Sequence, residues 1–333
     1  MSFSAITQHM AEIEDRNICS GIVLGVNVNS GCNMLDVAGR YCSYCAITQC
    51  NERGNEEVLS REQFTQAIYG ATKVTGYSLE GVTVCGDEPT ISDEVFYERT
   101  VPVLTAAKHV GTRYGLITNG FNLLKYQDDL LKLEADISVS LDAVGENNDR
   151  FRGGYYQVLN NLTCASAALK EKITIASVMK PGREEELEPL LDVIVELGIK
   201  KWVLSCLVRF RDATFAAVSR DTFCFLDMLA KKARKYGIEL LFDYHGKDAV
   251  STDFLRTVRK PRSIHLVRLC YDSEISVESH IFNESQRACK WITDNCISII
   301  IDRLIYQELY SRNLGFAGGC YFAVSSPLAE ARK

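Results

Sequence analysis

Strand-like and helix-like segments alternate along most of the chain, and this alternation limits the possible folds more than any other feature. Short apolar runs without a helical period predict six strands, at residues 21–29, 81–85, 114–118, 136–141, 173–179 and 202–208. Helical patterns follow them at residues 59–71, 93–110, 123–134, 151–170, 183–197 and 221–236. Repeated strand–helix units predict a parallel sheet with right-handed crossovers. We therefore expect an α/β fold, a partial, TIM-like barrel of the (β/α)6 type.

The 333 residues suit one barrel-sized domain with an extension better than two equal domains. We divide the chain into an N-terminal segment at 1–20, the partial barrel at 21–237 and a C-terminal extension at 238–333. The extension is expected to cover the barrel mouth and to bind substrate. Within it we predict two strands and one helix, at residues 238–244, 264–270 and 297–310.

Three cysteines follow the first predicted strand. Nine residues separate Cys32 from Cys42, and two separate Cys42 from Cys45. Three thiolates can hold three corners of a [4Fe–4S] cube and leave one iron open to a small molecule. In this arrangement Cys42 and Cys45 come from one tight turn, and Cys32 comes from a longer, flexible loop. The spacing leaves one alternative open, a zinc site completed by Cys50, which four residues separate from Cys45.

This segment resembles the cluster motif of the radical S-adenosylmethionine (SAM) superfamily, whose usual spacing is C-x3-C-x2-C. Tyr44 occupies the place of the family's aromatic residue before the last cysteine, and residues 30–33 (SGCN) match the lead-in of many members. The longer first spacer costs only about 1 kcal/mol of loop-closure free energy. The resemblance implies a [4Fe–4S] cluster on the three cysteines, SAM on its open iron, and chemistry at the carboxyl ends of the strands.

Polar motifs follow the second and third predicted strands, as the resemblance requires. Residues 85–89 (CGDEP) are similar to the family's GGEP segment, which implies that Gly86, Asp87 and Glu88 hold the SAM amino group. Asp87 replaces the second glycine of that pattern. Thr118 and Asn119 begin a TNG sequence that is similar to another family motif. Each motif by itself also fits an ordinary turn.

The fourth predicted strand ends in a segment that resembles the family's SLD…RG pattern. The resemblance implies that Ser140 and Arg152 contact the SAM carboxylate, whose shape matches the guanidinium fork, and that Asp142 lines the pocket. A helix-capping aspartate and a solvated arginine are the alternative. Four residues near the ends of the last two strands take positions where relatives contact ribose or adenine: Ser177, Met179, Ser205 and Leu207.

The C-terminal extension resembles no family segment. Cys320 follows two glycines and could donate a hydrogen atom to a substrate radical, although a buried structural cysteine is the alternative. The wide spacing of the late cysteines differs from the paired cysteines of a second cluster: Cys270, Cys289, Cys296 and Cys320. Five other polar residues could reach a substrate: His245, Lys247, His265, Arg268 and Tyr271.

Charge and cysteine content limit the partners and the compartment. The formal net charge of -6 disfavours a nucleic-acid substrate, which usually requires a basic surface. Thirteen cysteines in an enzyme-sized chain point to a reducing compartment and to metal rather than disulfides. The sequence contains neither a secretory signal nor an apolar run long enough for a membrane span. We therefore expect a cytoplasmic protein.

The resemblance implies a radical reaction. A reduced cluster would cleave SAM to a 5'-deoxyadenosyl radical that removes hydrogen from the substrate, with electrons from a donor such as flavodoxin or ferredoxin. We expect a small polar metabolite, such as a sugar, nucleoside or aminocyclitol, to be epimerised, dehydrated or oxidised. This expectation follows from two features that we do not find in the sequence, a leader-binding domain and a cluster-rich extension. The alternatives are a peptide-modifying enzyme, an activating enzyme for a glycyl-radical partner, and a non-catalytic zinc-binding module.

Overall fold

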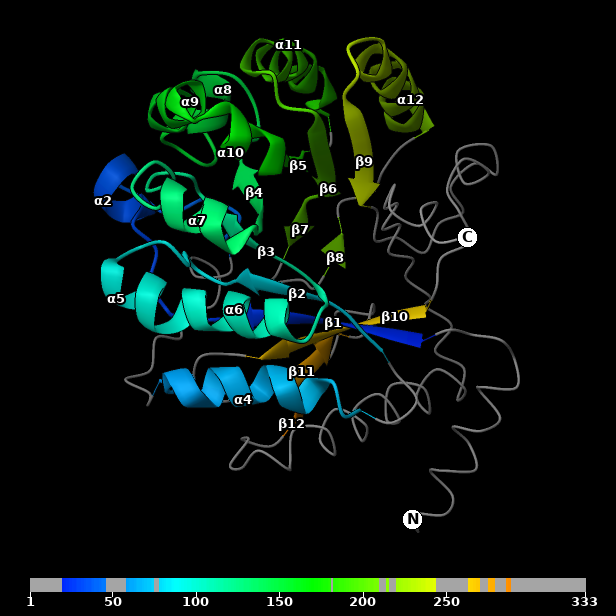
Figure 1. Cartoon of the computed structure of the whole chain (residues 1–333). Helices are drawn as coiled ribbons and strands as arrows, with labels where there is room; N and C mark the ends of the chain where they lie inside the picture. Colours follow the sequence, from blue (N-terminus) through cyan, green and yellow to red (C-terminus); the bar gives the residue numbers. More distant parts are fainter. Residues whose placement is uncertain are drawn as a thin grey trace.

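One curved sheet of ten strands organises the described part of the chain (Figure 1). The structure is a computed structural model. It describes residues 20–45, 58–74, 78–180, 182–209, 214–215, 220–243, 263–269, 275–278 and 286–288. From one edge of the sheet to the other, the strands are β12 (Gln286–Ala288), β11 (Ile275–Glu278), β10 (Ser263–Leu269), β1 (Ser20–Asn27), β2 (Ser78–Cys85), β3 (Arg113–Thr118), β4 (Asp136–Ser140), β5 (Ile173–Met179), β6 (Lys201–Cys206) and β9 (Glu239–Asp243). A separate antiparallel pair is formed by β7 (Val208–Arg209) and β8 (Thr214–Phe215).

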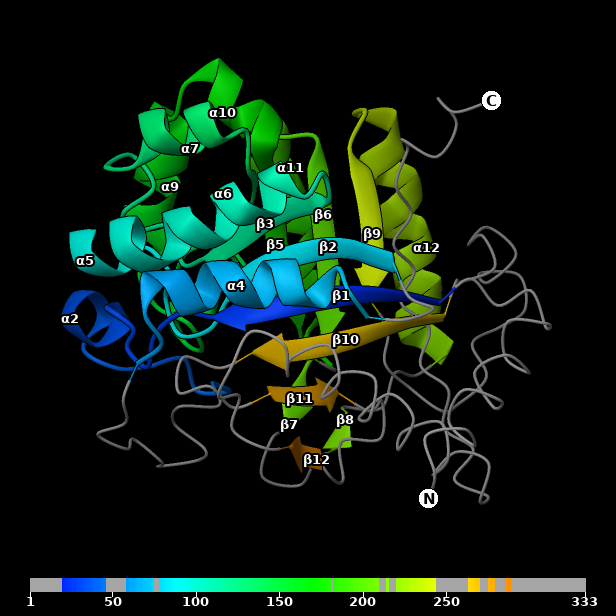
Figure 2. The ribbon, with the colours of Figure 1, turned by 60° about the horizontal axis from the view of Figure 1, so that its bottom comes forward.

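The six predicted strands are all present and lie side by side in sequence order. Each pairs in parallel with the next from β1 to β6, which confirms the α/β fold with an open parallel sheet. Two further parallel strands come from the predicted extension: β9 pairs with β6, and β10 pairs with β1 (Figure 2). The sheet therefore continues past residue 237 into the predicted extension. That the extension covers the barrel mouth stays a prediction.

Helices connect the strands and lie along the outer side of the curved sheet (Figure 1). The described helical segments are α2 (Met34–Ala38), α4 (Arg61–Ala71), α5 (Asp93–Val95), the π-helical turn η1 (Phe96–Thr100), α6 (Val101–His109), α7 (Gln127–Leu133), α8 (Glu146–Asp149), α9 (Tyr155–Cys164), α10 (Ala167–Lys172), the 3-10 turn η2 (Glu184–Glu186), α11 (Leu187–Leu197) and α12 (Arg220–Lys235). Helix α4 begins with the capping box that Ser60 and Gln63 predict, a device that stabilises a helix by about 1 kcal/mol.

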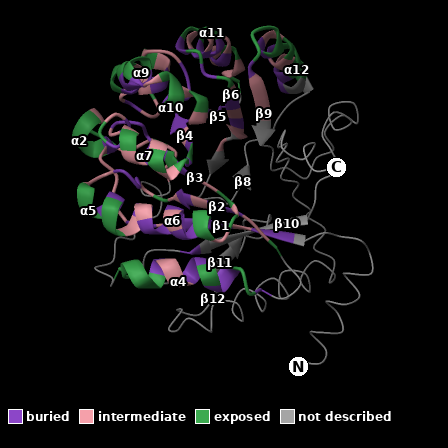
Figure 3. Ribbon diagram, viewed as in Figure 1, coloured by how far each residue is buried: buried purple, intermediate pink, exposed green. Residues whose placement is uncertain are grey.

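Burial alternates along the strands and identifies the face that packs on the helices (Figure 3). On β5, Ile173 and Ile175 are buried, whereas Thr174 between them and Ala176 and Val178 beyond them are partly exposed. Trp202 on β6 is also fully buried. Successive strand side chains point to opposite faces, so the residues alternating with the buried ones form the other face. We call that second face the inner face of the sheet.

Two predicted helices differ from the observed ones. The helix predicted at 151–170 is divided, because Ala165 is extended and Ser166 caps α10 through a 3.3 Å bond from the Leu169 N–H. Helix α7 begins at Gln127, four residues later than predicted, after a series of turns. Both differences come from local turn chemistry inside segments with helical apolar periodicity.

The spacer between the first two cysteines of the motif is not the flexible loop that we expected. It contains α2, whose first residue, Met34, is buried in the core, and Gly39 ends the helix in the left-handed conformation. The nine-residue arm is therefore an ordered element that carries Cys32 and Cys42 at its two ends. The helix predicted at residues 297–310 lies outside the described residues.

Candidate active site

The cysteine segment packs against the loops that follow β3 and β4. The Asn119 side-chain N–H donates to Cys32 Sγ at 3.7 Å, and the Cys42 thiol donates to the Arg152 carbonyl at 4.0 Å. The Cys45 N–H donates to the Cys42 carbonyl at 3.0 Å, which closes the expected tight turn. All three cysteines are therefore placed beside the carboxyl ends of the parallel strands, where such sheets carry their active sites.

The burial of the thiols bears on which metal they fit. Burial is the largest cause that raises the pKa of Cys32 to about 12, and burial also raises the pKa of Cys42. No group of three His, Cys, Asp or Glu residues within the described ranges is arranged to hold a single metal ion. Cysteine thiolates are the usual ligands of iron–sulfur clusters. Cys32, Cys42 and Cys45 are half-buried thiols and so offer donors of that kind, and Cys50 lies outside the described residues.

Glu88 lies beneath the site rather than within reach of its surface. The side chain is 1% exposed, and burial raises its pKa. One carboxylate oxygen accepts from the Thr90 N–H at 3.0 Å, the Thr90 hydroxyl at 2.5 Å and the Thr118 hydroxyl at 2.7 Å. The other oxygen accepts from the Asn119 N–H at 2.7 Å. Glu88 therefore joins the ends of β2 and β3 and positions Asn119 beside Cys32.

Replacing Glu88 with glutamine should destabilise the fold. All four groups around the carboxylate donate, so an amide N–H2 must face at least one of them. A buried donor left without an acceptor costs about 1–3 kcal/mol, and urea denaturation would measure this loss in the free energy of unfolding. Glu94→Gln is the matched control, because that side chain is 73% exposed and pairs with Arg99. Equal stability of the two variants would contradict the prediction.

Gly86 and Asp87 form the turn above Glu88. Gly86 has a φ of +114°, and a Cβ atom there would lie 1.9 Å from Asn27 Oδ1. Only glycine fits this close approach between the ends of β1 and β2. Asp87 lies partly exposed on the same turn.

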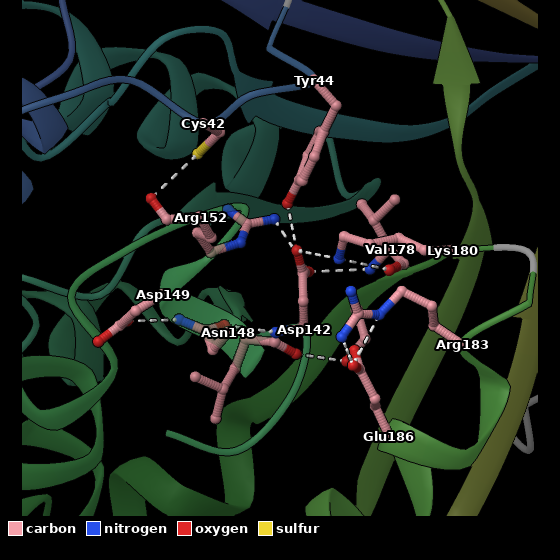
Figure 4. A network of polar contacts seen from close by, with 12 residues as sticks. Cys42, Tyr44, Asp142, Asn148, Asp149, Arg152, Val178, Lys180, Arg183 and Glu186 are labelled. Carbon is pink, nitrogen blue, oxygen red and sulfur yellow. Dashed lines mark hydrogen bonds and ion pairs between the residues drawn. The ribbon is translucent and has the colours of Figure 1, made fainter. Parts of the chain in front are cut away.

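Asp142 is the centre of a buried polar cluster at the ends of β4 and β5 (Figure 4). Its Oδ1 accepts from Arg152 Nη2 at 3.2 Å and from the Val178 N–H at 3.0 Å. Its Oδ2 accepts from Lys180 Nζ at 3.1 Å and from the Tyr44 hydroxyl. We call these four residues and Asp142 the Asp142 cluster. It connects the cysteine turn to two strands of the sheet.

Charge is unevenly distributed in this cluster. Burial opposes ionisation of Asp142, but Arg152 and Lys180 outweigh it and lower the pKa of this carboxyl to about 2. Two cations thus face one carboxylate. In the part of the chain that the structure describes, two buried side-chain atoms have no hydrogen-bond partner, Arg152 Nε and Asn29 Oδ1. Arg152 therefore retains one N–H for a ligand of this cluster, and the Asn29 side chain retains an acceptor in the segment that follows β1.

Lys180 was missed by the sequence analysis. Its Nζ lies 5.3 Å from the centre of the Tyr44 ring and 4.8 Å from that of Phe151, both within cation–π range. The available signal was a lysine directly after the apolar run that ends at Met179, at the carboxyl end of a parallel strand. The residues predicted as SAM contacts on that strand were Ser177 and Met179, and Lys180 was not among them.

Two expected SAM contacts lie on the helix-facing side of the sheet instead. The Ser177 hydroxyl donates to the Leu141 carbonyl and accepts from Trp202 Nε1 at 2.9 Å, and Met179 is buried in the core. The Leu207 N–H donates to the Met179 carbonyl at 3.1 Å. Ser140 and Ser205 alternate with helix-facing residues and so belong to the inner face.

The candidates from the predicted extension lie on β10 or outside the described residues. The backbones of His265 and Arg268 pair with Ile22 and Gly25 across β10 and β1. The following candidates lie outside the described residues: His245, Lys247, Cys270, Tyr271, Cys289, Cys296 and Cys320.

Comparisons with known proteins show which family model and which solved structures this chain is similar to. The family model of the radical SAM superfamily matches residues 26–194. No curated protein matched the chain. The structure of Streptococcus suis SuiB bound to the precursor peptide SuiA is similar, with a TM-score of 0.64 and 13% identity over 92% of this chain and 70% of SuiB.

Two other solved structures share the fold. SuiB bound to S-adenosylmethionine has a TM-score of 0.56 at 13% identity, and the match covers 84% of this chain and 66% of that one. Native anSMEcpe with bound AdoMet and Cp18Cys peptide has a TM-score of 0.51 at 12% identity, over 80% of this chain and 79% of that one. This chain thus spans slightly less than two thirds of the SAM-bound SuiB chain. Of the helices in the described ranges, none could span a bilayer.

Proposed function

Because the chain belongs to the radical SAM superfamily, we propose that Cys32, Cys42 and Cys45 hold its [4Fe–4S] cluster and that the enzyme removes hydrogen from a substrate bound beside it. The family uses this cluster with SAM, so the chain is a SAM-dependent enzyme rather than a non-catalytic zinc module. When bound, the two cofactors supply the electron transfer and the radical chemistry. The electron comes from an external reductant, for which we propose flavodoxin or ferredoxin.

The observation that carries the proposal is the convergence of separate motifs on the cysteine segment. Asn119 follows β3 and contacts Cys32, and the Arg152 backbone follows β4 and contacts Cys42. Tyr44, between the last two cysteines, donates to Asp142. Motifs distant in sequence therefore contact the same cysteine segment, which a chance spacing of cysteines does not explain.

The unpaired atoms of the site suit the amino-acid portion of SAM. We assign Arg152 Nε to the carboxylate, because it is a buried cationic N–H without a partner. We assign Asn29 Oδ1 to the ammonium group, because it is a buried acceptor without a partner. Glu88 acts by positioning, since donors of the chain already occupy both of its oxygens.

For the substrate we propose a small polar metabolite, such as a sugar, nucleoside or aminocyclitol, which is epimerised, dehydrated or oxidised. The inner face supports this choice. Ser138 and Ser140 on β4 and Ser205 on β6 belong to it by alternation, and on β5 between these strands Ala176 pairs with Ser140 and Val178 pairs with Ser205. Hydroxyls beside small side chains can exchange hydrogen bonds with a hydroxylated ligand.

A peptide substrate is the second candidate. SuiB was solved with a precursor peptide and anSMEcpe with the Cp18Cys peptide, and both share the fold of this chain. At 11–14% identity this likeness shows the fold and leaves the substrate of this chain to experiment.

Anaerobic turnover tests the function and separates the two substrate classes. Protein reconstituted with iron and sulfide, then reduced and given SAM, should form 5'-deoxyadenosine faster with its substrate than without it. Panels of deuterated sugars, nucleosides and aminocyclitols would be compared with deuterated peptides by mass spectrometry. Deuterium in 5'-deoxyadenosine from a metabolite alone supports the first candidate, and deuterium from a peptide supports the second. A fully loaded, reduced protein that never cleaves SAM would refute the proposal.

A further inference from the structure

Lys180 is a buried cation to which the SAM assignment gives no role. The side chain is 8% exposed, and its Nζ donates to Asp142 Oδ2 at 3.1 Å and to the Val178 carbonyl at 3.3 Å. Burying an ammonium group costs several kcal/mol unless the site supplies a partner charge and hydrogen bonds. The ion pair of Lys180 is with Asp142. The role of Lys180 therefore depends on which other groups bind the Asp142 carboxylate.

Asp142 connects the cysteine turn to the rigid sheet (Figure 4). Its own N–H donates to Asn148 Oδ1 at 3.0 Å, and its Oδ1 accepts from the Val178 N–H at 3.0 Å, so the carboxylate is fixed at the ends of β4 and β5. The Tyr44 hydroxyl donates to the same carboxylate from a residue 98 positions away. Tyr44 is thus tied to the sheet through one oxygen, which Lys180 also contacts.

The turn that carries Tyr44 also carries two of the three thiols. Its backbone is held by two bonds, from the Ser43 N–H to the Phe151 carbonyl at 2.8 Å and from the Cys45 N–H to the Cys42 carbonyl at 3.0 Å. The bond from Tyr44 to Asp142 is a long-range side-chain contact of the same turn. Ordering a residue costs about 1–2 kcal/mol of conformational entropy, so each contact made before iron binds reduces the cost of binding it.

We propose that Lys180 and Asp142 are positioning residues that hold the Cys42–Cys45 turn ready for the cluster. Lys180 orients Asp142 Oδ2 toward the Tyr44 hydroxyl and places its charge within 5.3 Å of the Tyr44 ring and 4.8 Å of Phe151. Lys180 therefore contacts the two residues that hold the turn in place. These are Asp142, which accepts from the Tyr44 hydroxyl, and Phe151, whose carbonyl accepts from the Ser43 N–H. This inference rests on the proposed assignment of the cysteines as cluster ligands.

Hydrogen–deuterium exchange of the whole chain without iron tests the proposal directly. Tyr44→Phe removes one hydroxyl, and Lys180→Met removes the charge but keeps the aliphatic stem. In each variant the amides of the peptide that contains residues 41–45 should exchange at least about fivefold faster, and peptides from α11 should be unchanged. Iron uptake during reconstitution at limiting iron should slow in the same two variants.

Matched controls come from equivalent contacts on the surface. Tyr97→Phe removes a tyrosine bond to Asp129 of 2.9 Å, and Lys231→Met removes an ion pair with Asp227 of 2.6 Å. Both should leave exchange of the cysteine turn at the parent rate. Lys180→Arg, which restores the charge, should recover most of the protection that Lys180→Met loses.

The outcomes separate this inference from the proposed function. Exchange of the turn within twofold of the parent in both Tyr44→Phe and Lys180→Met overturns it, whatever happens to activity. If Lys180→Met loosens the whole chain, Tyr44→Phe decides, because it removes a single atom. The readout needs neither cluster nor SAM, so a protein that fails to cleave SAM can still show protection that depends on Lys180. A protein that cleaves SAM with an unprotected turn refutes the inference alone.

Discussion

Cys42→Ser should reduce cluster loading and SAM cleavage by more than about 100-fold. Changes outside the ligand shell already cost 10–100-fold in metal affinity, and a ligand is worth more. The half-buried thiol lies on the turn that Tyr44 anchors, and a serine oxygen is a poorer ligand for iron–sulfur clusters than a thiolate. Cys32→Ser and Cys45→Ser should have the same effect. Iron and sulfide per chain and 5'-deoxyadenosine formation are the measurements.

Two exposed thiols provide the control for this experiment. Cys164→Ser and Cys224→Ser make the same chemical change at sites outside the cysteine segment. Both variants should load iron and cleave SAM as the parent does. Parent-like iron, sulfide and turnover in Cys42→Ser would remove this residue from the ligand set and, with it, the basis of the proposed site.

Asp142→Asn should cost about 3–5 kcal/mol in the free energy of unfolding, because it leaves two buried cations without their anion. Arg152 and Lys180 both lie at hydrogen-bond distance from the carboxylate that is lost. The amide also turns a donor toward one of the four groups that now donate to Asp142. Urea denaturation of the iron-free chain would measure the loss.

The acid dependence of stability gives the same prediction a second readout. The folded-state pKa of Asp142 is about 2, below its usual 3.8, so its ionised form stabilises the fold. That contribution is fully present above pH 3.8 and disappears as the pH falls through 2. The shift corresponds to about 2 kcal/mol. The difference between the parent and Asp142→Asn should therefore shrink by this amount at the acid end.

Asp129 offers a close match for the control. It also accepts from a tyrosine and a lysine, Tyr97 at 2.9 Å and Lys132 at 3.3 Å, but its side chain is 34% exposed. Water can replace those partners, so Asp129→Asn should cost less than about 1 kcal/mol. Equal losses in the free energy of unfolding for Asp142→Asn and Asp129→Asn would contradict the prediction that the buried cluster contributes more to stability than an exposed one.

The sequence predicted the strands well because a short apolar run without a helical period is a local signature of a strand. The apolar runs at 114–118 and 173–179 coincide with β3 and β5 to within one residue. The helix predicted at 151–170 was less accurate, since a single extended residue at Ala165 divides it without altering the apolar period. The strands at 239–243 and 263–269 were predicted from the sequence. Their parallel pairing with β6 and with β1, at the two ends of the series of six strands, was not predicted.

Site residues could be predicted from the sequence where a motif is contiguous. They could not be predicted where the role of a residue depends on which face of the sheet its side chain lies. Cys42, Tyr44 and Cys45 were identified within four consecutive positions, 42–45. Ser177 was assigned to the cofactor, yet it faces Trp202 and the helices. A shift of one residue in a strand reverses the face, and pattern-based strand ends carry more uncertainty than that.

The sequence by itself determined the order of strands and helices and the family, and it singled out the three thiols that we propose as cluster ligands, because these features depend on neighbours in the chain. The tertiary structure alone decided that Glu88 supports Asn119, that α2 orders the long cysteine spacer, and that Asp142 joins Tyr44 to Lys180. Tyr44 and Asp142 are 98 positions apart, and Asp142 and Lys180 are 38 positions apart. Contacts over such distances leave no local period, since only the packing of the sheet brings their strand ends together.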